Sequence, residues 1–299
     1  MTFLRMSMNN TQFQRFCEIA LQKAGLSLKA GKEALVEARV AKRLRALGIG
    51  TAQEYLEYLE QEPTGEEIVQ FLDTISTNFT SFMREADHFD FLGSLAKEWL
   101  RSGRKRVRIW CAASSTGQEP YGIGMTLAEV FAGGEVDFRI LATDISTKVL
   151  AHAEAGCYTQ RELQALPRYL RARYFGRDSG WVSSAPIFRV APKLRQHIVF
   201  KRLNLAELPY PMQGPFDAVF CRNVMIYFDH KTRVGLVSEV ERLLRPGGFL
   251  ITGHAETLTG IARVLKLIQP TIYERQAADR TECQSESRDG GARTPTCKR

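Results

Sequence analysis

The sequence predicts an α/β protein with a Rossmann-like, mostly parallel sheet, a small N-terminal helical domain and an inserted β subdomain. Three observations support this prediction. The first hundred residues show helical periodicity, apolar strands alternate with helices from Arg106 onward, and an aromatic, arginine-rich stretch interrupts that alternation. Strands that alternate with helices form parallel sheets covered on both faces. With 299 residues and 44% hydrophobic content, the chain can bury a substantial core without disulfides or metal.

Residues 10–100 are predicted to form the N-terminal helical domain. Capping-box spacing marks helix starts at Thr11 (with Gln14) and at Thr51 (with Glu54), and Gly25 and Gly48 end the first two helices. The four predicted helices carry apolar faces formed by Phe13, Phe16, Ala20, Leu21 and Ala24; by Leu35, Ala38, Ala41 and Leu44; by residues within 52–61; and by Ile68, Phe71, Leu72 and Ile75.

Residues 101–276 are predicted to form the sheet domain. Its strands are VRIWCA, FRILATD, HIVF, FDAVFC and GFLITG, followed by the hairpin VLKLIQPTIYERQ, which would place one antiparallel strand at the end. The segment 157–196 is too long for a simple crossover, and its GWVSSAPIFRV stretch indicates an inserted β subdomain. Residues 277–299 are polar and lack large apolar side chains, so we expect a disordered tail.

Composition limits the location and the partners. The net charge of +8 and pI near 9.2 suit nucleic acid, an acidic membrane surface or an acidic protein. No apolar run reaches the roughly 20 residues that a membrane helix needs, and the N-terminus lacks a secretory signal, so we expect a cytoplasmic protein without membrane insertion. The six cysteines show no metal-ligand spacing, and we expect no metal; Cys111 and Cys221 are predicted to lie in the core.

Polar residues follow four of the predicted strands, where ligands bind in open α/β sheets. A small-residue loop precedes Pro120, Asp144 ends the second strand, and Asn204 and Asn223 follow later strands. Asp144 can accept hydrogen bonds from ribose hydroxyls or cap the next helix, and each asparagine alone could be a turn residue. Together the four clusters predict one shared pocket for an adenosine-containing ligand.

Several strings then carry a specific resemblance. In order they are NFTSFMRE (78–85), AASSTGQEPYG (112–122), TDIS (143–146), CRNVMIYFD (221–229), LLRPGGFL (243–250) and GHAE (253–256). From about residue 10 to 275 the chain resembles the chemotaxis receptor glutamate methyltransferases, of the CheR type, although Ser146 replaces a residue that is often acidic. The resemblance implies a class I SAM methyltransferase sheet with a helical N-terminal domain and a small β subdomain.

The resemblance also implies a cofactor, S-adenosylmethionine (SAM), which leaves as S-adenosylhomocysteine. Glu119 and Asp144 would lie near its methionine amino group and ribose, and residues from the end of the helical domain would close over it. The implied cofactor-binding residues are Asn78, Thr80, Arg84, Glu119, Asp144, Asn204, Leu205, Arg222 and Asn223.

The implied catalytic residues are Arg84 and Tyr227, which would position a substrate carboxylate. A glutamate has a reference pKa near 4.3 and is already ionised at neutral pH, so no general base is needed. Alternatively, Arg84 pairs with Glu85 or Asp87 and Tyr227 belongs to the core.

The resemblance implies the acidic helical cytoplasmic region of chemoreceptors as the partner, and we expect a monomer that binds no nucleic acid. Two basic regions could attract such a partner or could be solvated faces: 161–202, with ten arginines and lysines, and the set Arg39, Lys42, Arg43 and Arg45. The alternatives are a nucleic-acid methyltransferase, which the basic charge suits, and a SAM-binding signalling scaffold without catalysis.

Overall fold

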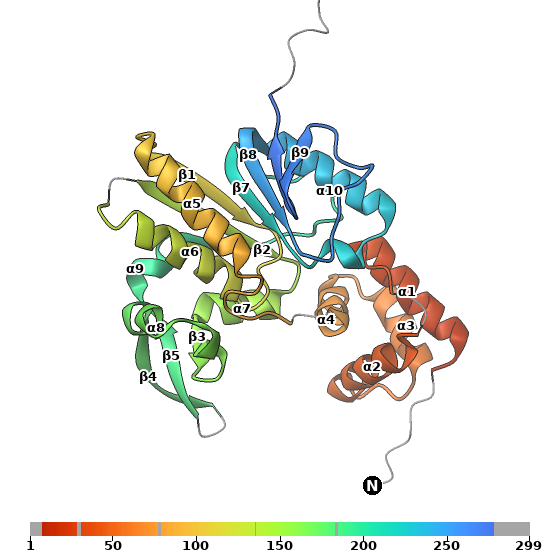
Figure 1. Ribbon diagram of the computed structural model, residues 1–299. Coiled ribbons are helices and arrows are strands. Elements are labelled where there is room, and N and C mark those ends of the chain that lie inside the picture. Colours follow the sequence, from red (N-terminus) through yellow and green to blue (C-terminus); the bar gives the residue numbers. More distant parts are fainter. Residues whose placement is uncertain (1–7, 29–30, 77–78, 135, 183–184, 278–299) are drawn as a thin grey trace, which may run out of the picture.

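The computed structural model describes residues 8–28, 31–76, 79–134, 136–182 and 185–277. Figure 1 shows its helical N-terminal part beside a central sheet, with a smaller β subdomain projecting from the sheet domain. No helix within these ranges has the length and apolar character to cross a membrane. Asn78 and the predicted tail from residue 278 onward lie outside the described residues.

Four helices form the N-terminal part: α1 (Asn10–Ala24), α2 (Glu33–Leu47), α3 (Ala52–Gln61) and α4 (Glu66–Ile75). Their apolar faces meet in a core of their own, in which the rings of Phe16, Tyr55 and Phe71 lie with centroids 5.6 to 6.3 Å apart. The predicted α3 and its Thr51 capping box are confirmed.

Two details of the first helices differ from the prediction. The capping box of α1 is formed by Asn9 and Gln12, so the helix begins before Thr11. Helix α2 buries Val36, Val40 and Leu44, whereas Leu35 is 41% exposed. Two overlapping apolar stripes run along α2, one through Leu35 and the alanines and one through Val36 and Val40. Tertiary packing buries the second stripe, whose β-branched side chains are larger than the alanines.

The central sheet has seven strands in the order β6-β2-β1-β7-β8-β10-β9. The predicted mixed sheet is confirmed: β10 pairs antiparallel with both of its neighbours, and the pairs from β6 to β8 are parallel. The strands are β1 (Arg106–Cys111), β2 (Asp137–Asp144), β6 (Ile198–Arg202), β7 (Phe216–Cys221), β8 (Leu244–Thr252), β9 (Leu265–Gln269) and β10 (Ile272–Arg275).

Both faces of this sheet are covered by helices, as its apolar strands predict. In β1, Ile109 and Cys111 belong to the core under α5 (Asp87–Arg101) and α6 (Gln118–Val130). The alternate residue Trp110 belongs to the core under α10 (His230–Leu243). Cys111 and Cys221 are both fully buried, as predicted.

Helix α5 packs with the sheet domain although the sequence assigned it to the helical one. Phe89, Leu92 and Trp99 share a core with the sheet and α6, not with α1–α4. This packing favours a domain boundary near residue 77 in place of the predicted boundary at residue 100.

The inserted segment contains a three-stranded antiparallel sheet in the order β3-β5-β4, in agreement with the predicted β insertion. Phe82, which follows α4, makes edge-on ring contacts with Tyr158 at 5.0 Å and Phe175 at 5.6 Å. The subdomain is therefore anchored to the segment that leads into the pocket. The insertion and its flanks comprise α7 (Thr147–Ala155), β3 (Cys157–Thr159), η1 (Glu162–Ala165), α8 (Arg168–Tyr174), β4 (Phe175–Val182), β5 (Ala185–Val190) and α9 (Pro192–Arg195).

Candidate active site

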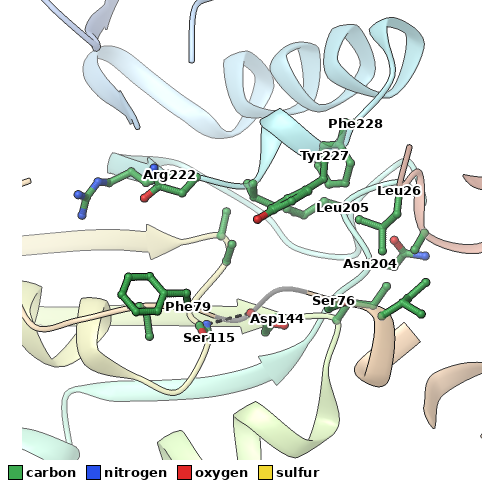
Figure 2. Close-up of a pocket in the computed structure, with 18 of the residues that line it drawn as sticks. Leu26, Ser76, Phe79, Ser115, Asp144, Asn204, Leu205, Arg222, Tyr227 and Phe228 are labelled. Atoms are coloured by element: carbon green, nitrogen blue, oxygen red, sulfur yellow. Dashed lines mark hydrogen bonds between the residues drawn. The ribbon is translucent and has the colours of Figure 1, made fainter. Parts of the chain in front are cut away.

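A pocket opens at the carboxyl ends of β1, β2, β6 and β7, where the sequence places its polar clusters. Its empty volume is about 1100 Å³ with its open mouth included, which is large enough for a nucleoside cofactor and part of a substrate. Apart from Asn78, every predicted site residue lines it, namely Thr80, Arg84, Glu119, Asp144, Asn204, Leu205, Arg222, Asn223 and Tyr227. In Figure 2, Tyr227 and Asp144 lie on opposite walls.

Asp144 ends β2 and is 8% exposed. Its two carboxylate oxygens accept one backbone N–H each, from Ser115 at 2.8 Å and Ser146 at 3.0 Å. Burial raises the pKa of Asp144, and those two hydrogen bonds oppose the rise. Each oxygen keeps a lone pair for a further donor, so the carboxylate fits a ribose diol. The N-cap of α7 is Ser146, so Asp144 is not the helix cap.

Arg222 follows β7 and forms the charged centre of the site, with its side chain 1% exposed. Its guanidinium pairs with Glu119 at 2.7 Å and Glu85 at 3.0 Å, and also donates to the carbonyl of Arg84. Two carboxylates therefore neutralise Arg222, which acts as a bridge between α6, β7 and the turn before α5. Glu119 is held by the same ion pair and accepts a hydrogen bond from Cys111.

Glu256, in the GHAE string, supports the pocket wall from behind, and the sequence analysis left it without a role. Its carboxylate accepts four backbone N–H groups, and it is 6% exposed. Three of them belong to the residues from Asn223 to Met225, at 2.7 to 2.9 Å, and the fourth to Gly253 at 2.6 Å. Asn223 has a φ of 58°, a conformation uncommon for non-glycine residues, so Glu256 holds a turn that sterics alone would disfavour. The signal available in the sequence was an acidic residue shortly after the end of β8.

Asn204 connects the pocket to the helical part. Its amide nitrogen donates to the carbonyl of Lys23 at 2.7 Å and to Glu207 at 2.8 Å, and its oxygen accepts from the N–H of Ala206. Both amide donors are therefore engaged. We infer that this side chain anchors the end of α1 and that hydrogen-bond donation to an adenine falls to other groups of this wall.

Arg84 lies between two non-glycine residues with positive φ, Met83 at 54° and Glu85 at 56°. Its guanidinium donates to the carbonyl of Phe79 at 3.2 Å. Within the described part of the chain it has no ion pair, so the alternative in which Glu85 or Asp87 neutralises Arg84 is wrong there.

Tyr227 ends the short helix η2 (Met225–Tyr227) and lines the same pocket, half-buried. Its backbone carbonyl accepts from the N–H of Ser27 at 2.7 Å, and Leu26 forms a β-bridge with Phe228. The ammonium of Lys32 lies 5.6 Å from the centre of its ring. The α1–α2 connection thus reaches the tyrosine that the sequence placed in the site.

A mostly parallel sheet with a terminal antiparallel strand, and an acid at the end of β2 facing a nucleoside-sized pocket, define a methyltransferase of the class I type. The family described as "CheR methyltransferase, SAM binding domain" matches residues 78–273, and "CheR methyltransferase, all-alpha domain" matches residues 11–76. The chain belongs to the CheR methyltransferase family and is a SAM-dependent enzyme, as its motifs predict.

Curated relatives agree with this assignment. The chemotaxis protein methyltransferases of Salmonella typhimurium and Escherichia coli are each 39% identical to this chain over 269 residues. Those alignments cover 90% of this chain and 91% and 92% of the relatives. Chemotaxis protein methyltransferase 2 of Pseudomonas aeruginosa is 39% identical over 261 residues, which cover 87% of this chain and 91% of that protein.

Proposed function

We propose that this enzyme transfers the methyl group of SAM to glutamate carboxylates of chemoreceptors, giving glutamyl methyl esters and S-adenosylhomocysteine. The observation that carries the proposal is the contrast between two arginines of one pocket. Arg222 is neutralised by two carboxylates, whereas Arg84 has no ion pair among the described residues. A guanidinium at a pocket wall suits a carboxylate substrate.

The residues fit the cofactor in chemistry and in space. The Asp144 carboxylate would accept from the ribose hydroxyls, and the Glu119 carboxylate, fixed by Arg222, would face the methionine amino group. Thr80, Leu205 and Asn223 would complete the cofactor wall. The proposed assignment also includes Asn78, by the resemblance alone.

SAM supplies a methyl group on a sulfonium, which is already an activated electrophile. The side chains of this enzyme then have to position a carboxylate that is ionised at neutral pH. Arg84 would grip it by its planar fork, and the hydroxyl of Tyr227 would donate a second hydrogen bond. Holding the reacting atoms in line supplies up to roughly 7–11 kcal/mol in well-oriented systems, and the transfer needs neither a general base nor a metal.

The partner we propose is the acidic helical cytoplasmic region of a chemoreceptor, bound by a monomeric, cytoplasmic enzyme. On α2, two of the four basic residues have structural roles. Arg39 donates to the carbonyls of Ile75 and Ser76, and Arg43 pairs with the buried Glu67 at 2.5 Å. Of the basic set on α2, the proposal therefore keeps only Lys42 and Arg45, which are exposed, as docking residues.

Charge reversal tests this surface. Lys42→Glu with Arg45→Glu should raise the apparent KM for receptor, flatten its dependence on salt and leave cofactor affinity unchanged, since exposed charges mainly steer encounter. Arg101→Glu, on the exposed end of α5, is the matched control. If neither KM nor salt dependence changes, the basic segment 161–202 becomes the candidate.

Labelled SAM distinguishes the proposed reaction from its alternatives. The enzyme is incubated with receptor-containing membranes and, separately, with nucleic acid. Base-labile label released as methanol from the receptor supports a glutamyl ester. Label in nucleic acid would show a nucleic-acid methyltransferase, and cofactor binding without transfer to either would show a signalling scaffold.

A further inference from the structure

A second cluster of side chains lies behind Arg84, at the start of α5. It comprises Glu85, His88 and His254, each of which offers a metal-ligand atom, and these three atoms all lie within 4.8 Å of one another. Glu85 lies in the turn just before α5, His88 lies in the first turn of α5, and His254 comes from the loop after β8. The rings of the two histidines meet edge-on with centroids 5.1 Å apart.

Nδ1 of His88 is buried and has no hydrogen-bond partner among the described residues. The whole side chain is 0% exposed. An unpaired buried polar atom costs about 1–3 kcal/mol, so it calls for a physical explanation.

The other ring nitrogen of His88 already has a partner. Nε2 of His88 lies 2.7 Å from the hydroxyl of Thr271. The nitrogen left for a further ligand is therefore Nδ1.

Nδ1 of His88 faces a carboxylate. Oε2 of Glu85 lies 3.4 Å from Nδ1. That carboxylate accepts hydrogen bonds from Asn223 at 3.1 Å and from Arg222 at 3.0 Å. The unpartnered ring nitrogen of His88 thus faces a carboxylate oxygen with no hydrogen bond between them. Two ligand atoms that each lie about 2.0–2.1 Å from a tetrahedral Zn²⁺ are about 3.3 Å from each other. This distance is close to the 3.4 Å between Oε2 of Glu85 and Nδ1 of His88.

We propose that Glu85, His88 and His254 form a binding site for a divalent borderline metal, with Zn²⁺ as the fitting ion. Two imidazoles and one carboxylate are a ligand set that zinc uses with a fourth position left open. His254 is 53% exposed, so that position would face solvent. Asp87 lies 3.1 Å from Nε2 of His254, as the carboxylate partners of metal-bound histidines do.

The surrounding charge permits a cation. Arg222 is the nearest positive group, and it already lies between Glu85 and Glu119. Asp87 adds a third carboxylate beside the two histidines. Oε2 of Glu85 accepts from Arg222 and keeps a second lone-pair direction. A bound ion would join the start of α5 to the loop after β8, and none of its ligands contacts the reacting atoms in the proposed methyl transfer, although Glu85 also pairs with Arg222.

Zinc titration of the full-length, chelator-treated protein tests the site. We expect calorimetry to show one saturable equivalent that His254→Ala weakens at least about tenfold and that the control His230→Ala, also exposed, leaves unchanged. Zn²⁺ should raise the melting temperature of the wild type and of His230→Ala but not of His254→Ala. Replacement by Co²⁺ should give the visible absorption of a four-coordinate site.

Two results would overturn the proposal. Equal zinc affinity in His254→Ala would place the ion elsewhere, for example on a cysteine thiol. Absence of saturable binding in the wild type would mean that Glu85 and His88 share a proton instead. Because His254 is exposed, its replacement should leave the fold intact, which far-ultraviolet circular dichroism checks.

Discussion

Replacement of Glu256 by glutamine is a direct test of how the loop after β7 is held. Oε1 of Glu256 accepts the N–H groups of Val224 and Met225, and Oε2 accepts those of Asn223 and Gly253. A glutamine keeps one of these oxygens and puts an NH₂ group in the place of the other. In either orientation of the amide, two backbone donors then face a third donor.

The magnitude follows from those two lost acceptors. An unsatisfied buried donor costs about 1–3 kcal/mol, so the pair costs about 2–6 kcal/mol. Burial raises the pKa of Glu256, which means that its charge is itself costly to bury, and removal of that charge returns part of the loss. We therefore expect Glu256→Gln to lower the free energy of unfolding by about 1–5 kcal/mol, against a typical total of 5–15 kcal/mol.

Urea denaturation of the purified protein measures this change. Glu98→Gln, on the exposed side of α5, is the matched control and should stay within about 0.5 kcal/mol of the wild type. Calorimetry with S-adenosylhomocysteine should also show weaker binding for Glu256→Gln, because Asn223 lines the pocket. If Glu256→Gln were as stable as the control, the four hydrogen bonds would not hold the turn.

Three further predictions concern the pocket and its surroundings. Asp144→Ala should weaken S-adenosylhomocysteine binding by about 1–3 kcal/mol in calorimetry; unchanged affinity would remove the proposed ribose contact. Arg84→Ala should reduce the rate of methyl transfer far more than stability, with Tyr227→Phe a milder version; near-normal turnover would exclude the positioning role. For His88, the folded pKa of about 4 lies below the unfolded value of about 6.5, so the unfolded chain binds the proton first as pH falls. With a chelator present, His88 should therefore lower the free energy of unfolding by about 2 kcal/mol between pH 7 and pH 5, and an equal pH dependence in His88→Asn would contradict this.

The identity of the strands and the position of the pocket follow from local sequence. A buried parallel strand is a continuous apolar run, and a polar residue at its end marks the ligand edge, which is why Asp144 and Asn223 could be placed before the structure. Helix α2 shows the limit of this reasoning. Its alternative stripes through Leu35 and Val36 differ by one position, and only contact with α4 and the other helices decides which is buried.

The roles of charged and amide side chains were harder to predict, because their partners are remote in sequence. Arg222 is neutralised by Glu119 and Glu85, 103 and 137 positions away. Asn204 reaches the end of α1, 181 positions away. Residue type and motif place both side chains at the pocket, but only the fold shows that they hold its walls together.

Charge balance in the proposed reaction gives this arrangement a reason. A sulfonium and a carboxylate enter the pocket as opposite charges and leave as neutral products, so charge is lost on the way to the transition state. A buried, unpaired arginine beside the carboxylate would then stabilise the reactants more than the transition state and would slow transfer. Neither arginine of the pocket is both buried and unpaired. Arg222 is buried but neutralised by Glu85 and Glu119. Arg84 has no ion pair among the described residues, but it is only partly buried. At that position solvent screens the charge, and the planar fork still orients a carboxylate toward the methyl group.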